Sequence, residues 1–179
     1  MKENGKKNTS TKMIAFVGAL GAIYFVLSLL SVGSNDFKAS FESLAVLVGA
    51  LTLGPIPGML VGLVGEFVHQ LVAYGLDPTT PLWLLPYMAE GLFVGLLVKK
   101  NLGNIPRKQL ITAIIAGEIL LTAVVTPVNW AAAVIQGWGN WAMILAALPL
   151  RLGIMAVRIV LYCLVLPILY PRLRKVVKL

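Results

Sequence analysis

Apolar runs separated by short polar links dominate this chain and restrict the structures that it can form. A helix of roughly 20 mostly apolar residues crosses a bilayer core of about 30 Å. The runs cover Met13–Val32, Leu44–Leu53, Met59–Tyr74, Trp83–Val98, Leu110–Val128 and Leu145–Leu169. After the short second run, two prolines in Gly54-Pro55-Ile56-Pro57-Gly58 end one helix and begin the next. The sequence predicts an all-α integral membrane protein, a bundle of six transmembrane helices.

The composition supports a lipid environment for most of the chain. Of 179 residues, 59% are hydrophobic and 12% are charged, whereas soluble domains are about a quarter charged. We expect a polar tail at residues 1–12, a transmembrane substrate-binding domain at 13–170 and a basic tail at 171–179. A basic start before an apolar run can be a signal peptide. This run is long and no small-x-small cleavage site follows it, so we interpret it as a retained helix.

Positive charge gathers outside the apolar runs. Twelve of the 15 basic residues form three clusters: Lys2, Lys6, Lys7 and Lys12; Lys99, Lys100, Arg107 and Lys108; Arg172, Arg174, Lys175 and Lys178. Six spans place all three clusters on one side, and the positive-inside rule makes both termini cytoplasmic. The opposite loops, 75–82 and 129–141, contain no Lys or Arg. The clusters suit anionic lipid headgroups, and without interleaved aromatic residues we expect no nucleic-acid binding.

Polar residues within the apolar runs fall on single helical faces and are candidates for function, because charge inside a membrane is costly. Spacings of three, four or seven residues define four polar stripes. They are Glu66, His69 and Gln70; Trp83, Tyr87 and Glu90; Glu118, Thr122 and Asn129; Arg151, Arg158 and Tyr162. Trp83, Tyr87, Asn129 and Trp130 lie toward the outer ends of their helices. Together with the deeper glutamates they outline a cavity open to the outside, typical of small-molecule sites.

Structural interpretations of the same residues remain open. Glu118 or Glu66 can form an ion pair with Arg158, and Trp138 and Trp141 can be interfacial anchors. A strip of small residues on the first helix, Ala15, Ala19 and Ala22, can be internal packing or a docking face. One histidine and one cysteine, Cys163, make a metal site improbable. No Walker-type phosphate loop and no Gly-x-Ser-x-Gly motif is present, so we expect no ATPase or hydrolase activity.

Four features resemble the S-components of energy-coupling factor (ECF) vitamin transporters. They are the size with six spans, the Ala15-x-x-x-Ala19 strip, the Ser40-Phe41-Glu42 lead into a short second helix, and the Leu-Gly-Pro-Ile-Pro-Gly hinge at 53–58 before a glycine-rich helix. The resemblance covers nearly all of the chain from Lys12 onward. It implies a non-enzymatic, high-affinity subunit of the bacterial cell membrane that needs no cofactor. Its partners would be a transmembrane scaffold protein and two ATPases.

The same resemblance assigns candidate residues. The substrate site would use Trp83, Tyr87, Glu90, Asn129, Trp130 and Arg151, with loops 33–41, 75–82 and 129–141 as gates. The alanine strip, Ala15, Ala19 and Ala22, would dock on the scaffold. Acids outnumber bases in the membrane, which favours a neutral or cationic vitamin, although one arginine could hold a carboxylate.

The vitamin itself stays open among riboflavin, pyridoxine-type, thiamine-type, cobalamin, folate and pantothenate. A self-contained secondary transporter or channel is the main alternative, because Glu66, Glu90 and Glu118 could relay ions. A non-transporting membrane scaffold and an intramembrane enzyme are further alternatives.

Overall fold

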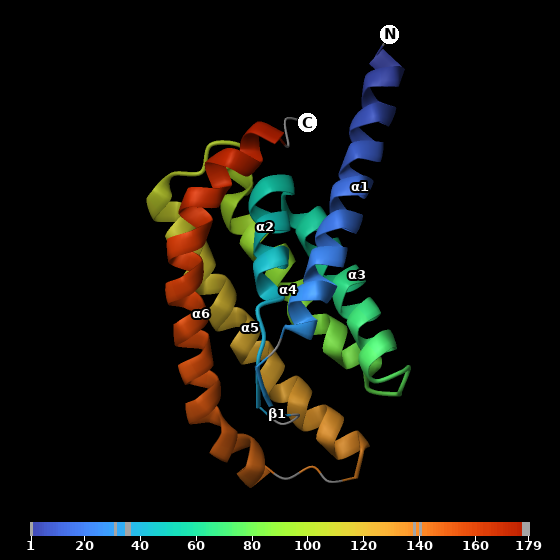
Figure 1. Cartoon of the computed structure of the whole chain (residues 1–179), viewed down its shortest axis with the longest axis vertical. Helices are drawn as coiled ribbons and strands as arrows, with labels where there is room; N and C mark the ends of the chain where they lie inside the picture. Colours follow the sequence, from blue (N-terminus) through green and yellow to red (C-terminus); the bar gives the residue numbers. More distant parts are fainter. Residues whose placement is uncertain (1, 31, 35–36, 138, 140, 177–179) are drawn as a thin grey trace.

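The computed structural model is a helical bundle with one short β-hairpin (Figure 1). It describes residues 2–30, 32–34, 37–137, 139 and 141–176. Within these residues the helices are α1 (Lys2–Leu29), α2 (Ser43–Leu53), α3 (Pro55–Ala73), α4 (Thr80–Val98), α5 (Arg107–Ile135) and α6 (Trp141–Val176). Strands β1 (Val32–Ser34) and β2 (Phe37–Ala39) pair antiparallel, and a 3-10 turn, η1 (Lys99–Asn101), follows α4.

Five of these helices, α1, α3, α4, α5 and α6, are long and apolar enough to cross a membrane. The exception is α2, whose 11 residues rise only about 16 Å and cannot cross a core of about 30 Å. The expected break is present: Gly54 has a φ of 97° at the end of α2, and Pro55 starts α3. The described residues form six α-helices, of which five are long enough to span, so the prediction of six transmembrane helices is not confirmed.

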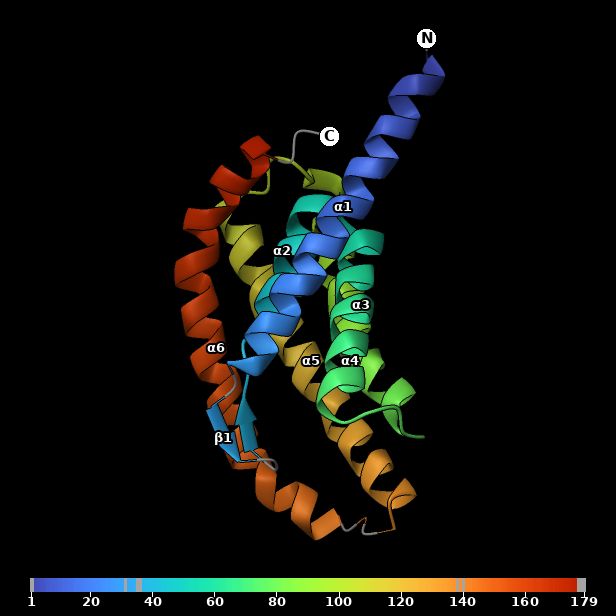
Figure 2. The same cartoon turned by 45° about the vertical axis from the view of Figure 1, so that its right-hand side comes forward.

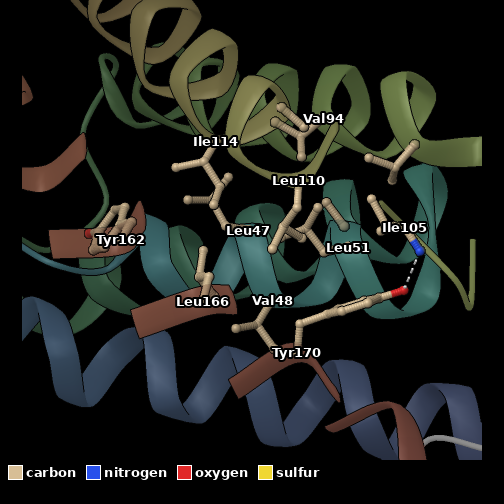
Figure 3. Close-up of a cluster of buried hydrophobic side chains, with 13 residues drawn as sticks. Leu47, Val48, Leu51, Val94, Ile105, Leu110, Ile114, Tyr162, Leu166 and Tyr170 are labelled. Carbon is tan, nitrogen blue, oxygen red and sulfur yellow. Dashed lines mark hydrogen bonds between the residues drawn. The ribbon is translucent and has the colours of Figure 1, made fainter. Parts of the chain in front are cut away.

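Helix α2 is short because it lies inside the bundle. Nine of its 11 residues are buried, and it carries apolar side chains on every face. Leu47 and Leu51 pack in a cluster with Val94 of α4 and Ile114 of α5, and Leu166 of α6 closes it (Figure 3). In the same cluster Tyr170 accepts a hydrogen bond of 3.3 Å from the Ile105 amide (Figure 3). This core fills the half of the bundle toward the two termini, away from the cavity described next.

Glycines bring α3 and α4 into close contact, because small residues let helix backbones approach each other in a membrane bundle. A Cβ on Gly91 would collide with the Gly58 backbone, and one on Gly95 would collide with Pro55. A Cβ on Gly62 would lie 2.6 Å from the carbonyl oxygen of Tyr87. The position of Tyr87 therefore depends on the absence of a side chain on α3.

Three helix boundaries differ from the sequence prediction. Helix α1 starts at Lys2, so the residues expected as a polar tail, from Lys2 to Lys12, continue the first helix. Helix α5 passes through Pro127 and ends at Ile135, because a membrane helix tolerates a proline where neighbouring groups satisfy the backbone. Helix α6 runs from Trp141 to Val176. Asn129 and Trp130 therefore lie on a helix, not in a loop.

Both ends of the described chain lie at the same end of the bundle. The first turns of α1, η1 and the last turns of α6 are together there in both views (Figures 1 and 2). The hairpin, the turn after α3, the end of α5 and the start of α6 lie toward the opposite end (Figures 1 and 2). The elements that carry the three basic clusters are thus on one side. Their cytoplasmic location stays a prediction.

Candidate functional site

A cavity of about 500 Å³ lies among the helices toward the hairpin end of the bundle. This size falls within the range of small-molecule sites. Its lining mixes apolar residues with charged, aromatic and amide side chains from α1, α3, α4, α5 and α6 and from the loops. The polar and aromatic members are Ser28, Ser40, Glu42, Glu66, His69, Gln70, Tyr74, Asp77, Thr79, Trp83, Tyr87, Thr122, Asn129, Gln136, Arg151 and Arg158.

Glu42 stands at the start of α2 and is held from two sides. The Tyr87 hydroxyl donates a hydrogen bond of 2.6 Å to Glu42 Oε1, and the Ser40 hydroxyl donates one of 2.5 Å to the same oxygen. Only 4% of Glu42 is exposed. Its other oxygen, Oε2, is buried and has no hydrogen-bond partner among the described residues. Glu42 therefore brings a positioned acceptor to the cavity wall.

Both carboxylate oxygens of Glu66, on α3, have partners on neighbouring side chains. Tyr24 donates a hydrogen bond of 2.7 Å to Oε2, His69 Nδ1 lies 3.1 Å from the same oxygen, and Gln70 donates one of 2.6 Å to Oε1. The expected face of Glu66, His69 and Gln70 is thus confirmed. The ring of Tyr24 meets that of Tyr87 edge-to-face at 5.3 Å, which links this group to Glu42.

A buried ion pair joins α5 to α6. Arg158 Nη2 lies 2.9 Å from Glu118 Oε2, and Ser43 donates a hydrogen bond of 2.9 Å to Glu118 Oε1. The Ser43 and Tyr162 hydroxyls are also 2.9 Å apart. Of the two ion pairs left open by the sequence, the structure contains Glu118 with Arg158, whereas Glu66 contacts other side chains. Arg158 lines the cavity, but its charge is already balanced.

Asp77 organises the turn that leads into α4. Its Oδ1 accepts hydrogen bonds from the Thr79 amide at 2.6 Å, the Thr79 hydroxyl at 2.6 Å and the Thr80 amide at 3.0 Å. The Thr80 hydroxyl accepts from the Asp77 amide at 3.1 Å, which completes a reciprocal cap. Hydrogen bonding by Thr79 lowers the pKa of Asp77 below its ordinary value. The turn at this rim of the cavity is thereby fixed in shape.

Four of the six residues expected at the substrate site line the cavity: Trp83, Tyr87, Asn129 and Arg151. Glu90 does not line it; this side chain is completely buried, and neither carboxyl oxygen has a hydrogen-bond partner in the described part of the chain. Trp130 also lies off the lining and stacks on Trp141, with ring centroids 4.8 Å apart. Trp141, which the sequence suggested as an interfacial anchor, therefore also packs against Trp130. Trp138, the other suggested anchor, lies outside the described residues.

Sequence reasoning left several lining residues out of the site. Glu42, Asp77 and Arg158 belong to the cavity, as does the group around Glu66. The stripe of Glu66, His69 and Gln70 was a usable signal because i, i+3 and i+4 positions meet on a helix. Glu42 gave no such signal, since its partner Tyr87 is 45 residues away. Across the described residues no three His, Cys, Asp or Glu side chains are grouped as metal ligands.

The alanine strip lies apart from the cavity. Ala15, Ala19 and Ala22 are exposed on the outer face of α1. The inner face of the same helix carries Val17 and Tyr24, which are buried against the bundle. The strip is therefore available for contact with lipid or with another protein.

Comparison with known proteins matches this architecture. Residues 12–170 match the family model of the substrate-specific component of ECF transporters. A solved structure with the description "Structure and mechanism of the S component of a bacterial ECF transporter" has a similar fold, with a TM-score of 0.71 and 23% sequence identity. The match covers 95% of this chain and 99% of that one. The chain belongs to the family of ECF transporter substrate-specific components.

Proposed function

We propose that this protein captures a water-soluble vitamin or related micronutrient from outside the cell with high affinity, for ATP-driven uptake. The energy would come from a separate module made of a transmembrane scaffold subunit and two ATPases. The observation that carries the proposal is the cavity of about 500 Å³ at the end of the bundle away from the basic clusters. In the bacterial cell membrane the positive-inside rule turns that end outward.

The cavity has the features that a site for a small polar solute needs. Trp83 and Tyr87 provide aromatic surface one turn apart on α4, and Asn129 and Arg151 add hydrogen-bonding groups from α5 and α6. Such a mixture of apolar walls and a few placed polar groups gives both affinity and orientation. Glu42, just before α2, and Asp77, in the turn before α4, add two carboxylates to the lining.

Coupling to ATP requires partner subunits, because the sequence contains no phosphate-binding loop of its own. The exposed alanine strip, Ala15, Ala19 and Ala22, is the surface on which we place the scaffold subunit. Small side chains allow another helix to approach closely in lipid. No catalytic role is proposed for the chain itself.

The test begins with the full-length protein purified in detergent. Small molecules released on denaturation are identified by mass spectrometry, and each candidate vitamin is then titrated while tryptophan fluorescence is recorded. We expect one vitamin to bind stoichiometrically at nanomolar concentration. Because Trp83 lines the cavity and Trp141 does not, Trp83→Phe should remove most of the fluorescence change and Trp141→Phe should leave it.

Uptake in cells distinguishes the alternatives. Cells that make this chain together with the scaffold and both ATPases should accumulate the vitamin, and cells with inactive ATPases should not. Accumulation without the ATPases would favour a self-contained transporter. A protein that releases no solute and responds to no vitamin would contradict the proposed function and favour a membrane scaffold.

A further inference from the structure

Most charged groups on the cavity wall already have a hydrogen-bond or ion-pair partner within the protein. Glu66 accepts from Tyr24 and Gln70 and contacts His69, while Arg158 pairs with Glu118. Asp77 Oδ1 accepts hydrogen bonds from the Thr79 and Thr80 amides of its own turn. A bound solute is therefore not needed as a hydrogen-bond or ion-pair partner for these groups.

Three charged groups on the lining have a buried atom without a hydrogen-bond partner in the described residues, and one of them, Arg158, is neutralised by its ion pair with Glu118. Glu42 Oε2 and Arg151 Nη1 are both buried, and neither has a hydrogen-bond partner in the residues that the structure describes. A buried polar atom without a partner costs free energy, and a charged one costs more. Outside the Glu118–Arg158 ion pair, the cavity therefore presents one unmatched anionic oxygen from the start of α2 and one unmatched cationic N–H group from α6.

The surroundings of Glu42 favour a cation over a neutral donor. Its Oε1 is fixed by Tyr87 and Ser40, so Oε2 cannot turn away to find another partner without losing both bonds. Trp83 and Tyr87 line the same cavity, and aromatic faces attract cations. A protonated nitrogen that donates to Glu42 Oε2 would be stabilised by the carboxylate and by the adjacent rings.

We propose that the solute carries a basic nitrogen that binds Glu42 and, on another part of the same molecule, an oxygen acceptor that binds Arg151. This inference rests on the proposed function and narrows its substrate class to compounds with both groups. A solute that is only anionic would leave the Glu42 oxygen buried and unpaired, and an apolar one would leave both groups unpaired. The site would reject both kinds.

The experiment compares named probes on the full-length protein in detergent. Pyridoxamine carries a protonated primary amine and hydroxyl acceptors, whereas thiamine carries a hydroxyl and a quaternary cationic nitrogen that has no N–H to donate. Riboflavin and nicotinamide are uncharged, and biotin, pantothenate and folate are anionic. We expect saturable binding of pyridoxamine and at least about tenfold weaker binding of thiamine and of the uncharged and anionic probes, as one lost charged hydrogen bond predicts.

Variants then assign the two contacts. Glu42→Gln and Arg151→Gln should each weaken the binding probe by about ten- to hundredfold. Arg172→Gln is the matched control for Arg151→Gln: it also removes a guanidinium from α6, but from an exposed position outside the cavity lining, so affinity should stay within about twofold. Circular dichroism and gel filtration check that each variant is folded, and the probe comparison on the unmodified chain stands without them.

Three results would overturn the inference. Tight binding of thiamine, riboflavin, nicotinamide, biotin, pantothenate or folate in preference to pyridoxamine would contradict the inference and leave the proposed function intact. Unchanged affinity in folded Glu42→Gln or Arg151→Gln would do the same. Failure of every probe to bind, together with no solute released from the protein, would remove both the inference and the proposed function.

Discussion

Tyr24 and Tyr87 meet edge-to-face with ring centroids 5.3 Å apart, yet their hydroxyls serve different carboxylates. Tyr87 donates to Glu42 Oε1, whereas Tyr24 donates to Glu66 Oε2. Glu42 keeps one unmatched oxygen, and Glu66 keeps none. The two tyrosines therefore form one packing unit with two separable roles: one positions a group for the solute and the other stabilises the bundle.

This difference predicts different effects for the two Tyr-to-Phe variants. Tyr87→Phe keeps the ring but removes the hydrogen bond that ties Glu42 to α4, so affinity for the solute should fall about tenfold or more. Tyr24→Phe leaves Glu66 with His69 and Gln70. It should lower stability by about 1–3 kcal/mol and change affinity less. Fluorescence titration and thermal unfolding in detergent measure the two effects, and equal affinity losses would contradict the separation.

The Glu118–Arg158 pair provides a second prediction. Its side chains are almost completely buried, so removing one partner leaves the other charge without compensation. Glu118→Gln and Arg158→Gln should each destabilise the protein by roughly 3–5 kcal/mol. The double variant should recover much of that loss, because no unpaired charge remains. Additive losses in thermal unfolding of the double variant would show that the pair does not act as a unit.

The cap at Asp77 should make stability depend on pH in acid. Because hydrogen bonds to the carboxylate lower its pKa in the folded protein below the ordinary 3.8, the cap contributes fully above about pH 3.8. The contribution is lost as pH falls through the lower folded-state value. Asp77→Ala should therefore melt below the unmodified protein at pH 7, and the difference should shrink below pH 3.8. Asp77→Asn, which retains an acceptor oxygen, is the control and should show no such pH dependence. A difference that grows in acid would contradict this assignment.

The alanine strip predicts loss of uptake without loss of binding. Ala15→Trp or Ala19→Trp adds a large side chain to the exposed face of α1 and should block close approach of the scaffold subunit. Val160→Trp places the same side chain on an exposed position of α6 and is the matched control. Transport assays in cells with the full module, beside titration of the purified variants, measure both properties. If binding falls with uptake, the strip has a structural role instead.

Local patterns in the sequence predicted local structure well. The proline and glycine residues at 54–58 marked the break between α2 and α3, and the i, i+3 and i+4 spacing predicted the contacts of Glu66 with His69 and Gln70. Both depend on residues within one or two turns of each other. Periodicity and chain-breaking residues carry that information directly.

The remaining features depend on packing between distant segments. A short apolar run such as Leu44–Leu53 fits either a short span or a buried helix, and only its burial on all sides decides for the second. Glu42 meets Tyr87 across 45 residues, and Ser43 meets Glu118 across 75. No spacing rule in one helix relates such pairs. For this reason residue spacing could not place Glu42 in the site, and the site residues implied by the family resemblance included Glu90 and Trp130, which lie off the lining.

The close approach of α3 to α4 at Gly62 links bundle packing to the site. A methyl group at Gly62 would lie 2.6 Å from the Tyr87 carbonyl oxygen, so α4 must shift where it carries the tyrosine that holds Glu42. Gly62→Ala should therefore lower both the melting temperature and the affinity for the solute. Gly153→Ala on α6, where the new methyl group meets nothing within 4 Å, should leave affinity unchanged and stabilise the helix by about 0.5–1 kcal/mol. If Gly62→Ala melts lower but binds normally, Tyr87 is not positioned by this helix contact, and the geometry of Glu42 must be set by Ser40 and the start of α2 instead.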